Sequence, residues 1–114
     1  MANIYTSTLF TSGRDDYACY RIPALEVSSE GTILAFCEGR RYSCSDSGQI
    51  DLLLRRSTNH GADFDKPIVV ATQDGWVCGN PAPVLDKSTG TLWLIFCKNL
   101  QDGDEGMIIE GKAP

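Results

Sequence analysis

Short runs of apolar and β-branched residues, separated by turn sequences, recur along the whole chain of 114 residues. In no window do apolar residues follow the i, i+3, i+4, i+7 spacing that predicts a helix. The turn sequences, such as Ser28–Gly31, Asn59–Gly61 and Asp86–Gly90, are short and rich in Ser, Asn, Asp and Gly, and each can close a hairpin. The sequence therefore predicts an all-β fold without helices.

Eight segments have the composition of strands, namely Ile4–Phe10, Tyr17–Val27, Thr32–Glu38, Asp51–Ser57, Pro67–Thr72, Ala82–Asp86, Thr91–Lys98 and Met107–Glu110. Two apolar runs inside them, Leu34–Cys37 and Leu92–Phe96, are nearly continuous, which predicts strands covered on both faces in a stack of sheets. The extended segments Pro23–Leu25 and Pro81–Leu85 resemble each other at an offset of about 58 residues. This offset is somewhat longer than the roughly 40–50 residues of a typical propeller blade, so by itself it only suggests a repeating four-stranded unit.

The net charge is -5, from 15 acidic and 10 basic residues. This balance provides no overall field to attract nucleic acid or an anionic membrane surface, so an anionic ligand would need a few locally placed arginines. No apolar run approaches the roughly 18 residues that cross a bilayer. The first residues, Met1–Ser7, lack the charged and apolar regions of a secretory signal. We therefore expect no nucleic-acid partner and no membrane span, and a chain that is cytoplasmic or excised from a longer, secreted protein.

The five cysteines are Cys19, Cys37, Cys44, Cys78 and Cys97. Their number is odd and no two form a C-x-x-C pair, so the sequence predicts neither a disulfide framework nor a zinc site, and free thiols within strands are expected. The single histidine, His60, further weakens a metal site or a Cys/His catalytic pair. No metal or other cofactor is therefore predicted.

Three motifs follow one another along the first part of the chain: Tyr20–Leu25 with the sequence YRIPAL, Glu38–Arg40 with Asp46 six residues later, and Ser57–Phe64. The segments Ile50–Ser57 and Gly79–Pro83 support them. Together these residues resemble the N-terminal part of the exo-α-sialidases, or neuraminidases, over nearly the whole chain, and Ser57–Phe64 resembles the Asp box of that family.

The resemblance implies a sialidase-type six-bladed β-propeller with the sugar bound near its central axis. In this chain we expect about the first one and a half blades. Blade 1 would span about residues 17–72, blade 2 would begin over residues 80–114, and a strand at residues 4–10 would close the ring against the last blade. At roughly 40–50 residues per blade the chain is too short for a closed propeller of at least four blades. We therefore expect a fragment that needs the remaining blades.

Two arginines are candidate site residues. The resemblance makes Arg21 the first of three arginines that hold the carboxylate of sialic acid, and a guanidinium pairs with a carboxylate through two parallel hydrogen bonds. The alternative for Arg21 is a surface position on an edge strand. Arg40 matches a further family arginine beside the carboxylate and the ring 4-hydroxyl. Arg41 is its alternative, and because adjacent strand residues face opposite sides, a shift by one residue reverses the side chain.

Asp46 is the candidate acid/base by the same resemblance. A glycosidase needs a carboxyl group that is protonated when the leaving oxygen departs and ionised when water attacks. Asp51 is an alternative acid, and an ordinary Asp-Ser-Gly turn is another interpretation of Asp46. Asn80 matches an asparagine at the edge of the sugar pocket of the family, where it would bind the N-acyl or glycerol group. A turn-forming Asn before Pro is its alternative.

The Asp-box-like segment Ser57–Phe64 is expected to be structural, in the hairpin between the third and fourth strands of a blade and away from the sugar. It departs from the family pattern because Asn59 replaces Asp, Asp63 replaces Thr, and Phe64 stands in place of Trp. Asn still accepts backbone hydrogen bonds in a turn, whereas the other two changes weaken the packing of the box.

The resemblance thus implies the N-terminal part of an exo-α-sialidase, which hydrolyses terminal sialic acids from sialylated glycans with retention of configuration. The tyrosine nucleophile of the family, its partner glutamate and two more arginines belong to later blades, so the isolated chain is expected to be inactive. The competing class is a non-catalytic Asp-box propeller module that binds glycans or proteins, which would leave the spacing of Arg21, Arg40 and Asp46 to coincidence. A glycosidase of another specificity would need paired carboxylates instead of an arginine cluster.

Overall fold

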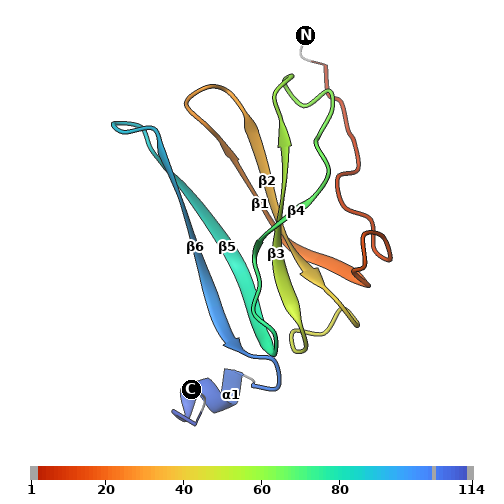
Figure 1. The fold of residues 1–114 in the computed structure, drawn as a ribbon, viewed down its shortest axis with the longest axis vertical. Coiled ribbons are helices and arrows are strands. Elements are labelled where there is room, and N and C mark those ends of the chain that lie inside the picture. The colour runs from red at the N-terminus through yellow and green to blue at the C-terminus, as the bar shows by residue number, and fades with distance from the viewer. Residues whose placement is uncertain (1–2, 104, 113–114) are drawn as a thin grey trace.

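Six strands and one short helix occur in the computed structural model, which describes residues 3–103 and 105–112. The strands are β1 (Cys19–Val27), β2 (Ile33–Arg40), β3 (Ile50–Ser57), β4 (Ile68–Ala71), β5 (Trp76–Asp86) and β6 (Thr91–Leu100), and the helix is α1 (Glu105–Ile109). Figure 1 shows β1 to β4 on one side, the β5–β6 hairpin beside them, and α1 below the end of β6. The chain is therefore all-β apart from one helix of five residues.

The first four strands form an antiparallel meander, in which each strand pairs with the next along the chain. β5 and β6 form a second antiparallel pair. β5 joins β3 through one parallel pair, between Ile50 and Val77. Antiparallel neighbours need only a short loop between them, so a chain of short strands and tight turns favours this topology.

The core lies between the meander and the β5–β6 hairpin. Leu34, Phe36 and Leu54 are buried at its centre, and Leu92 and Leu94 of β6 pack against them. The expectation that Leu34–Cys37 is covered on both faces is confirmed, because β2 is buried at every position from Leu34 to Arg40.

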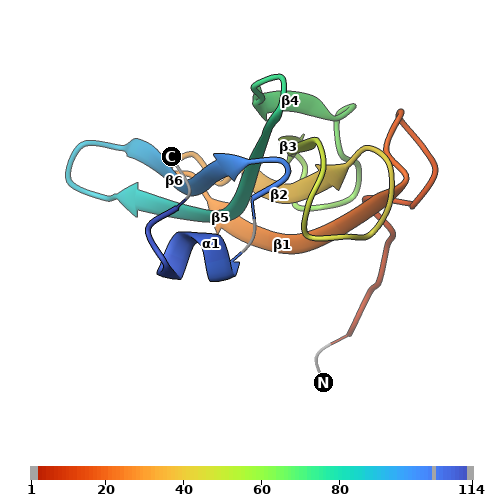
Figure 2. The ribbon, with the colours of Figure 1, turned by 90° about the horizontal axis from the view of Figure 1, so that it is seen from below.

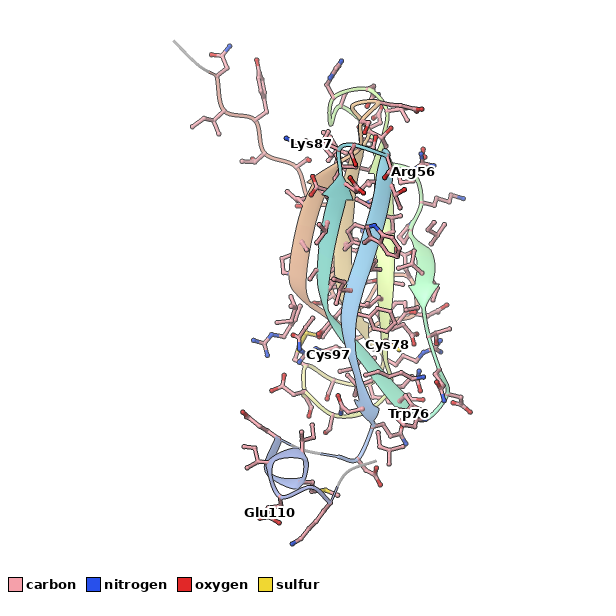
Figure 3. The ribbon with its side chains drawn as sticks, turned by 90° about the vertical axis from the view of Figure 1, so that its left-hand side faces the viewer. Arg56, Trp76, Cys78, Lys87, Cys97 and Glu110 are labelled. Atoms are coloured by element: carbon pink, nitrogen blue, oxygen red, sulfur yellow. A yellow bond between two sulfur atoms is a disulfide. The ribbon has the colours of Figure 1, made fainter. Side chains whose placement is uncertain are left out.

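The other apolar run, Leu92–Phe96, is covered on one face only, so the expectation of two covered faces is wrong there. Trp93 and Ile95 alternate with the inward residues and are 60% and 62% exposed. Figure 3 shows the hairpin that carries this run, with its tip at Lys87 and the start of β5 at Trp76. The outer face of the hairpin is therefore apolar, and no further sheet packs on it within residues 3–103 and 105–112.

Six of the eight expected strands are confirmed, with shifted ends. β5 begins at Trp76 instead of Ala82, because a bulge at Asn80–Pro81 interrupts its register without ending the strand. The segment Ile4–Phe10 is irregular in the described chain, and the strand expected there stays a prediction. The pairing proposed for it was with a blade outside this sequence, and a strand forms only where a neighbour pairs its N–H and C=O groups.

The strand expected at Met107–Glu110 is wrong, and with it the expectation of a chain without helices. Most of these residues lie in α1. The adjacent isoleucines favour a strand by composition, but they pair with no strand of the described chain. Local hydrogen bonds form instead, such as that from the Glu110 N–H to the Gly106 carbonyl at 2.9 Å.

A disulfide joins Cys19, the first residue of β1, to Cys44 in the loop that follows β2. The expectation of free thiols alone is therefore wrong for these two residues and holds for Cys37, Cys78 and Cys97. The cause is the register of the sheet: Cys19 pairs with Arg40, the last residue of β2. The loop after Arg40 is thus brought next to Cys19. The helix found among the described residues has five residues, which is too short to cross a membrane.

Candidate functional site

An open cavity of about 710 Å³ lies where β1 begins and β2 ends. Its wall includes Arg21, Glu38, Arg40, Asp46 and Asn80, so the structure brings together all four side chains expected at the sugar site and adds one more. Figure 2 views this end of the molecule, with α1 and the loop after β2 around the strand ends.

Arg21 stands immediately before a bulge in β1. The register of β1 shifts between Arg21 and Ala24, and Ile22 between them has φ of 57°. This left-handed conformation is rare for a β-branched residue and is maintained only where the surrounding structure imposes it. Bulges redirect side chains near functional sites. The half-exposed guanidinium of Arg21 accordingly faces the cavity.

The backbone of Arg21 is held from β2. The Cys37 thiol donates a hydrogen bond to the Arg21 carbonyl at 3.2 Å. Burial raises the pKa of Cys37 to about 11, so the thiol keeps its proton and remains a donor at neutral pH. This contact fixes the strand segment from which the Arg21 side chain extends.

Arg40 lies in the cavity wall, whereas Arg41 points to the other side of the strand. The Arg41 Nε donates to Asp51 Oδ2 at 3.1 Å, and its guanidinium lies over the ring of Tyr17 at 5.6 Å from the centroid. Adjacent strand residues face opposite sides. Arg40 therefore lines the cavity, and its alternative Arg41 does not.

The Arg40 side chain is only 4% exposed. Its Nη1 donates to Asp46 Oδ1 and to the Cys44 carbonyl, both at 2.8 Å. Its Nε and Nη2 donate to Glu38 Oε1 at 3.0 and 2.7 Å. Arg40 thus joins β2 to the loop that carries Asp46.

Asp46 projects from the 41–49 loop into the open side of the cavity, with 86% of its side chain exposed. Arg21 Nη1 lies 3.5 Å from the same Oδ1 that accepts from Arg40. The hydrogen bond and charge of Arg40, with a smaller contribution from Arg21, hold the pKa of Asp46 below its usual value. In the conformation described, Asp46 is therefore an ionised carboxylate held by two arginines.

Asp51, the alternative acid, is fully buried behind the cavity. It accepts hydrogen bonds from four side chains, namely Tyr17, Arg41, Gln49 and Thr72. Burial alone would raise the pKa of Asp51, but these donors together keep it below the usual value. Asp51 is therefore an anchor at the start of β3 and has no access to a ligand.

Glu38 is the site residue that the sequence reasoning missed as a candidate. It lies two residues before Arg40 on β2 and therefore on the same face, a signal that was available from the sequence. Its Oε1 accepts from Arg40 and its Oε2 accepts from the Asn80 backbone N–H at 2.9 Å. Asn80 itself occupies a bulge in β5 with φ of 54°, directly before Pro81.

The Asp-box-like segment connects β3 to β4 at the end opposite to the 41–49 loop, as Figure 1 shows. The buried Ser57 hydroxyl accepts from the Gly61 N–H at 2.9 Å, and Asn59 Oδ1 accepts from the Asp63 N–H at 2.9 Å. The replacement of Asp by Asn at position 59 thus preserves the turn. Across the described part of the chain, no group of His, Cys, Asp and Glu is arranged to hold a metal ion.

Fold and cavity together define a class of protein. A four-stranded antiparallel meander followed by a second antiparallel pair has the architecture of consecutive blades of a β-propeller. The solved structure of Hadza microbial sialidase Hz136 matches with a TM-score of 0.72 and 26% identity, covering 81% of this chain and 20% of that chain.

Curated proteins agree with this class. The exo-alpha-sialidase of Arthroderma benhamiae is 40% identical over 81 residues, covering 66% of this chain and 20% of that protein. The sialidase of Micromonospora viridifaciens is 31% identical over 108 residues, covering 90% and 17%, and Sialidase-3 of Rattus norvegicus is 36% identical over 95 residues, covering 79% and 22%. No family model matches the chain. The chain belongs to the exo-α-sialidase family, and it spans about a fifth of the length of the curated relatives it matches.

Proposed function

We propose that this chain is the N-terminal part of an exo-α-sialidase that removes terminal sialic acids from glycoconjugates with retention of configuration. The observation that carries the proposal is the convergence of Arg21, Arg40 and Asp46 on one cavity at the strand ends. We assign blade 1 to about residues 17–72 and the start of blade 2 to about residues 80–114.

Arg21 is the group best placed to receive the carboxylate of the sugar. Its side chain is half exposed, and its ion pair with Asp46 is long at 3.5 Å, so its donors are available to a ligand. A guanidinium binds a carboxylate through two parallel hydrogen bonds. Arg40 is nearly buried and already bound on both sides, so its main role at the sugar site is to hold Asp46. Asn80 completes the rim of the pocket.

Asp46 is the proposed acid/base, although in the chain described its pKa is lowered. A general acid must be protonated, and two changes on substrate binding favour the protonated form of Asp46. A sugar over the carboxylate removes water from it, and the negative charge of the substrate next to Arg21 offsets the charge that stabilises the ionised form. Both changes raise the pKa of a carboxyl group.

Tyr17 and Tyr20 are not proposed as the nucleophile. Sialidases use a tyrosine in place of a carboxylate, because a second carboxylate would repel that of the substrate. Here the Tyr17 hydroxyl donates to Asp51 and the Tyr20 hydroxyl donates to the Arg14 carbonyl. Retention needs two displacements at the anomeric carbon, so we assign the nucleophile to later blades and expect the isolated chain to be inactive.

The test compares the 114-residue chain with the full-length protein that contains it, on a fluorogenic aryl α-sialoside. We expect turnover by the full-length protein, with the α-anomer of sialic acid as the first product seen by NMR, and none by the isolated chain. Release of the fluorophore by the isolated chain would contradict the assignment of the nucleophile. Binding of the sialoside by the full-length protein without turnover would support a non-catalytic glycan-binding module instead.

A further inference from the structure

Glu38 is a buried carboxylate that the proposed reaction leaves without a role. Its side chain is 4% exposed. An ionised carboxylate is costly to bury unless it is paired and hydrogen-bonded. Both oxygens are occupied here: Oε1 accepts from Arg40 Nε and Nη2, and Oε2 accepts from the Asn80 backbone N–H. Glu38 is therefore placed to act through these two residues and not by contact with a sugar.

We propose that Glu38 is the positioning residue of the site, which aims Arg40 at Asp46 and couples the first meander to the bulge of β5 at Asn80. The proposal rests on the function proposed above. Two donors on one edge of the guanidinium are fixed by Glu38, so the remaining Nη1 is directed at Asp46 Oδ1 and the Cys44 carbonyl. Removal of the Glu38 charge frees Arg40 to rotate, and the Asp46 carboxylate that Arg40 holds is then no longer fixed in position.

Gly79 supplies an independent observation. A Cβ atom added at Gly79 would lie 2.5 Å from Glu38 Oε2, so any side chain at position 79 requires the Glu38 carboxylate to move. The φ of Gly79 is not in the left-handed region, so the backbone itself accepts alanine there. The absence of a side chain at position 79 thus allows Glu38 to approach β5. Gly79→Ala should therefore displace the Glu38 carboxylate without any change in charge.

The experiment uses the full-length protein with four variants: Glu38→Gln, Glu38→Asp, Gly79→Ala and, as a control of equal charge change, Glu30→Gln. Glu30 is exposed in the turn between β1 and β2. Each variant is measured on two substrates. The sugar leaving group of a sialyl disaccharide needs a proton from Asp46 to depart, whereas the leaving group of an activated aryl sialoside depends less on proton transfer. Circular dichroism and thermal unfolding identify any variant that fails to fold.

Misplacement of a catalytic group by about 1 Å can cost on the order of a hundredfold. We expect Glu38→Gln to lower kcat on the disaccharide by about tenfold or more, with a smaller loss on the aryl sialoside and little change in KM. Gly79→Ala should reproduce this pattern, Glu38→Asp should recover part of the rate, and Glu30→Gln should match the wild type. The double variant of Glu38→Gln and Gly79→Ala should lose no more than the worse single variant, since both act on one contact.

Equal losses on both substrates, or an increase in KM alone, would overturn the proposal, as would full activity of both Glu38→Gln and Gly79→Ala. If Glu38→Gln does not fold, Gly79→Ala carries the kinetic test. A wild-type protein without turnover would refute the proposed function, but it would not refute the coupling of Glu38 to Arg40 and Asn80. The coupling is then decided by NMR with ¹⁵N-arginine: a slowly exchanging Arg40 Nε–H that becomes fast in Gly79→Ala supports it, and an unchanged signal refutes it.

Discussion

At the scale of single residues, the charge of Asp46 is set by its neighbours. Arg40 and Arg21 both act on the carboxylate and hold its pKa low, which favours the ionised form that assists the attack of water. For the proposed first step Asp46 must instead carry a proton, and the rise of its pKa on substrate binding, argued above, favours this form. The bound sugar would thus bring the pKa of Asp46 closer to the value that an acid/base needs.

Asp46→Asn in the full-length protein tests this role. We expect kcat/KM on a sialyl disaccharide to fall by about 10²–10⁴-fold, the range of general acid–base catalysis, and the loss on an activated aryl sialoside to be much smaller. The amide still accepts a hydrogen bond from Arg40, so the loop should remain in place. Equal losses on the two substrates would argue against proton transfer by Asp46.

Asp51 affects stability rather than turnover. Because its folded pKa lies below the usual value of about 3.9, its ionised form stabilises the fold above that pH, and this contribution is lost as the pH falls through the folded pKa. We expect Asp51→Asn to cost about 3–5 kcal/mol, as for other broken buried pairs, and to flatten the decline of stability below about pH 4. Urea unfolding at pH 7 and pH 3 measures both. The matched variant Asp86→Asn, in an exposed turn, should cost far less.

At the scale of elements, the 41–49 loop is fixed at two points. The disulfide from Cys44 to Cys19 ties it to β1, and Arg40 binds the Cys44 carbonyl from β2. The two cysteines are 25 residues apart, and a cross-link that closes a loop of this size stabilises by about 3 kcal/mol through the unfolded state.

A peptide map under non-reducing conditions should therefore contain the Cys19 and Cys44 peptides linked to each other. Cys44→Ser should lower the free energy of unfolding by about 3 kcal/mol and reduce kcat on the disaccharide, because the Asp46 loop is freed at one anchor. Separate Cys19 and Cys44 peptides in the map would contradict the pairing. A fall in stability without any loss of kcat would show that Arg40 alone is sufficient to hold the loop.

The sequence predicts those elements whose partners are close along the chain. Six strands follow from alternating or apolar runs between turns, because each pairs with its neighbour. The strand expected at 107–110 is wrong, because composition indicates a strand but a strand forms only beside a partner. For residues 4–10 the expected partner is the last blade, so a strand there stays a prediction. The shared face of Glu38 and Arg40 follows from their spacing, but two other contacts depend on the folded sheet: Cys19 lies opposite Arg40, and Glu38 meets Asn80 across 42 residues. Spacing along the sequence does not show such contacts.

At the scale of the whole molecule, the outer face of the β5–β6 hairpin lacks the cover that the inner face has. Val84 pairs with Trp93 across the two strands, and Ile95 follows on the same face. All three are exposed in the described chain. If the chain is the first part of a propeller, further sheets cover this face, as β5 and β6 cover Leu34 and Phe36.

Because later blades would cover this apolar face, we expect activity to be restored when the two parts of the protein assemble. The 114-residue chain mixed with the separately produced remainder of the full-length protein should regain turnover of an aryl sialoside, because the two parts bring the arginines and the nucleophile together. Trp93→Glu should abolish this recovery and should destabilise the full-length protein by about 3–5 kcal/mol, the cost of losing a large buried aromatic residue. Lys87→Glu at the hairpin tip is the control and should leave both unchanged. Normal recovery with Trp93→Glu would show that this face stays exposed in the complete enzyme.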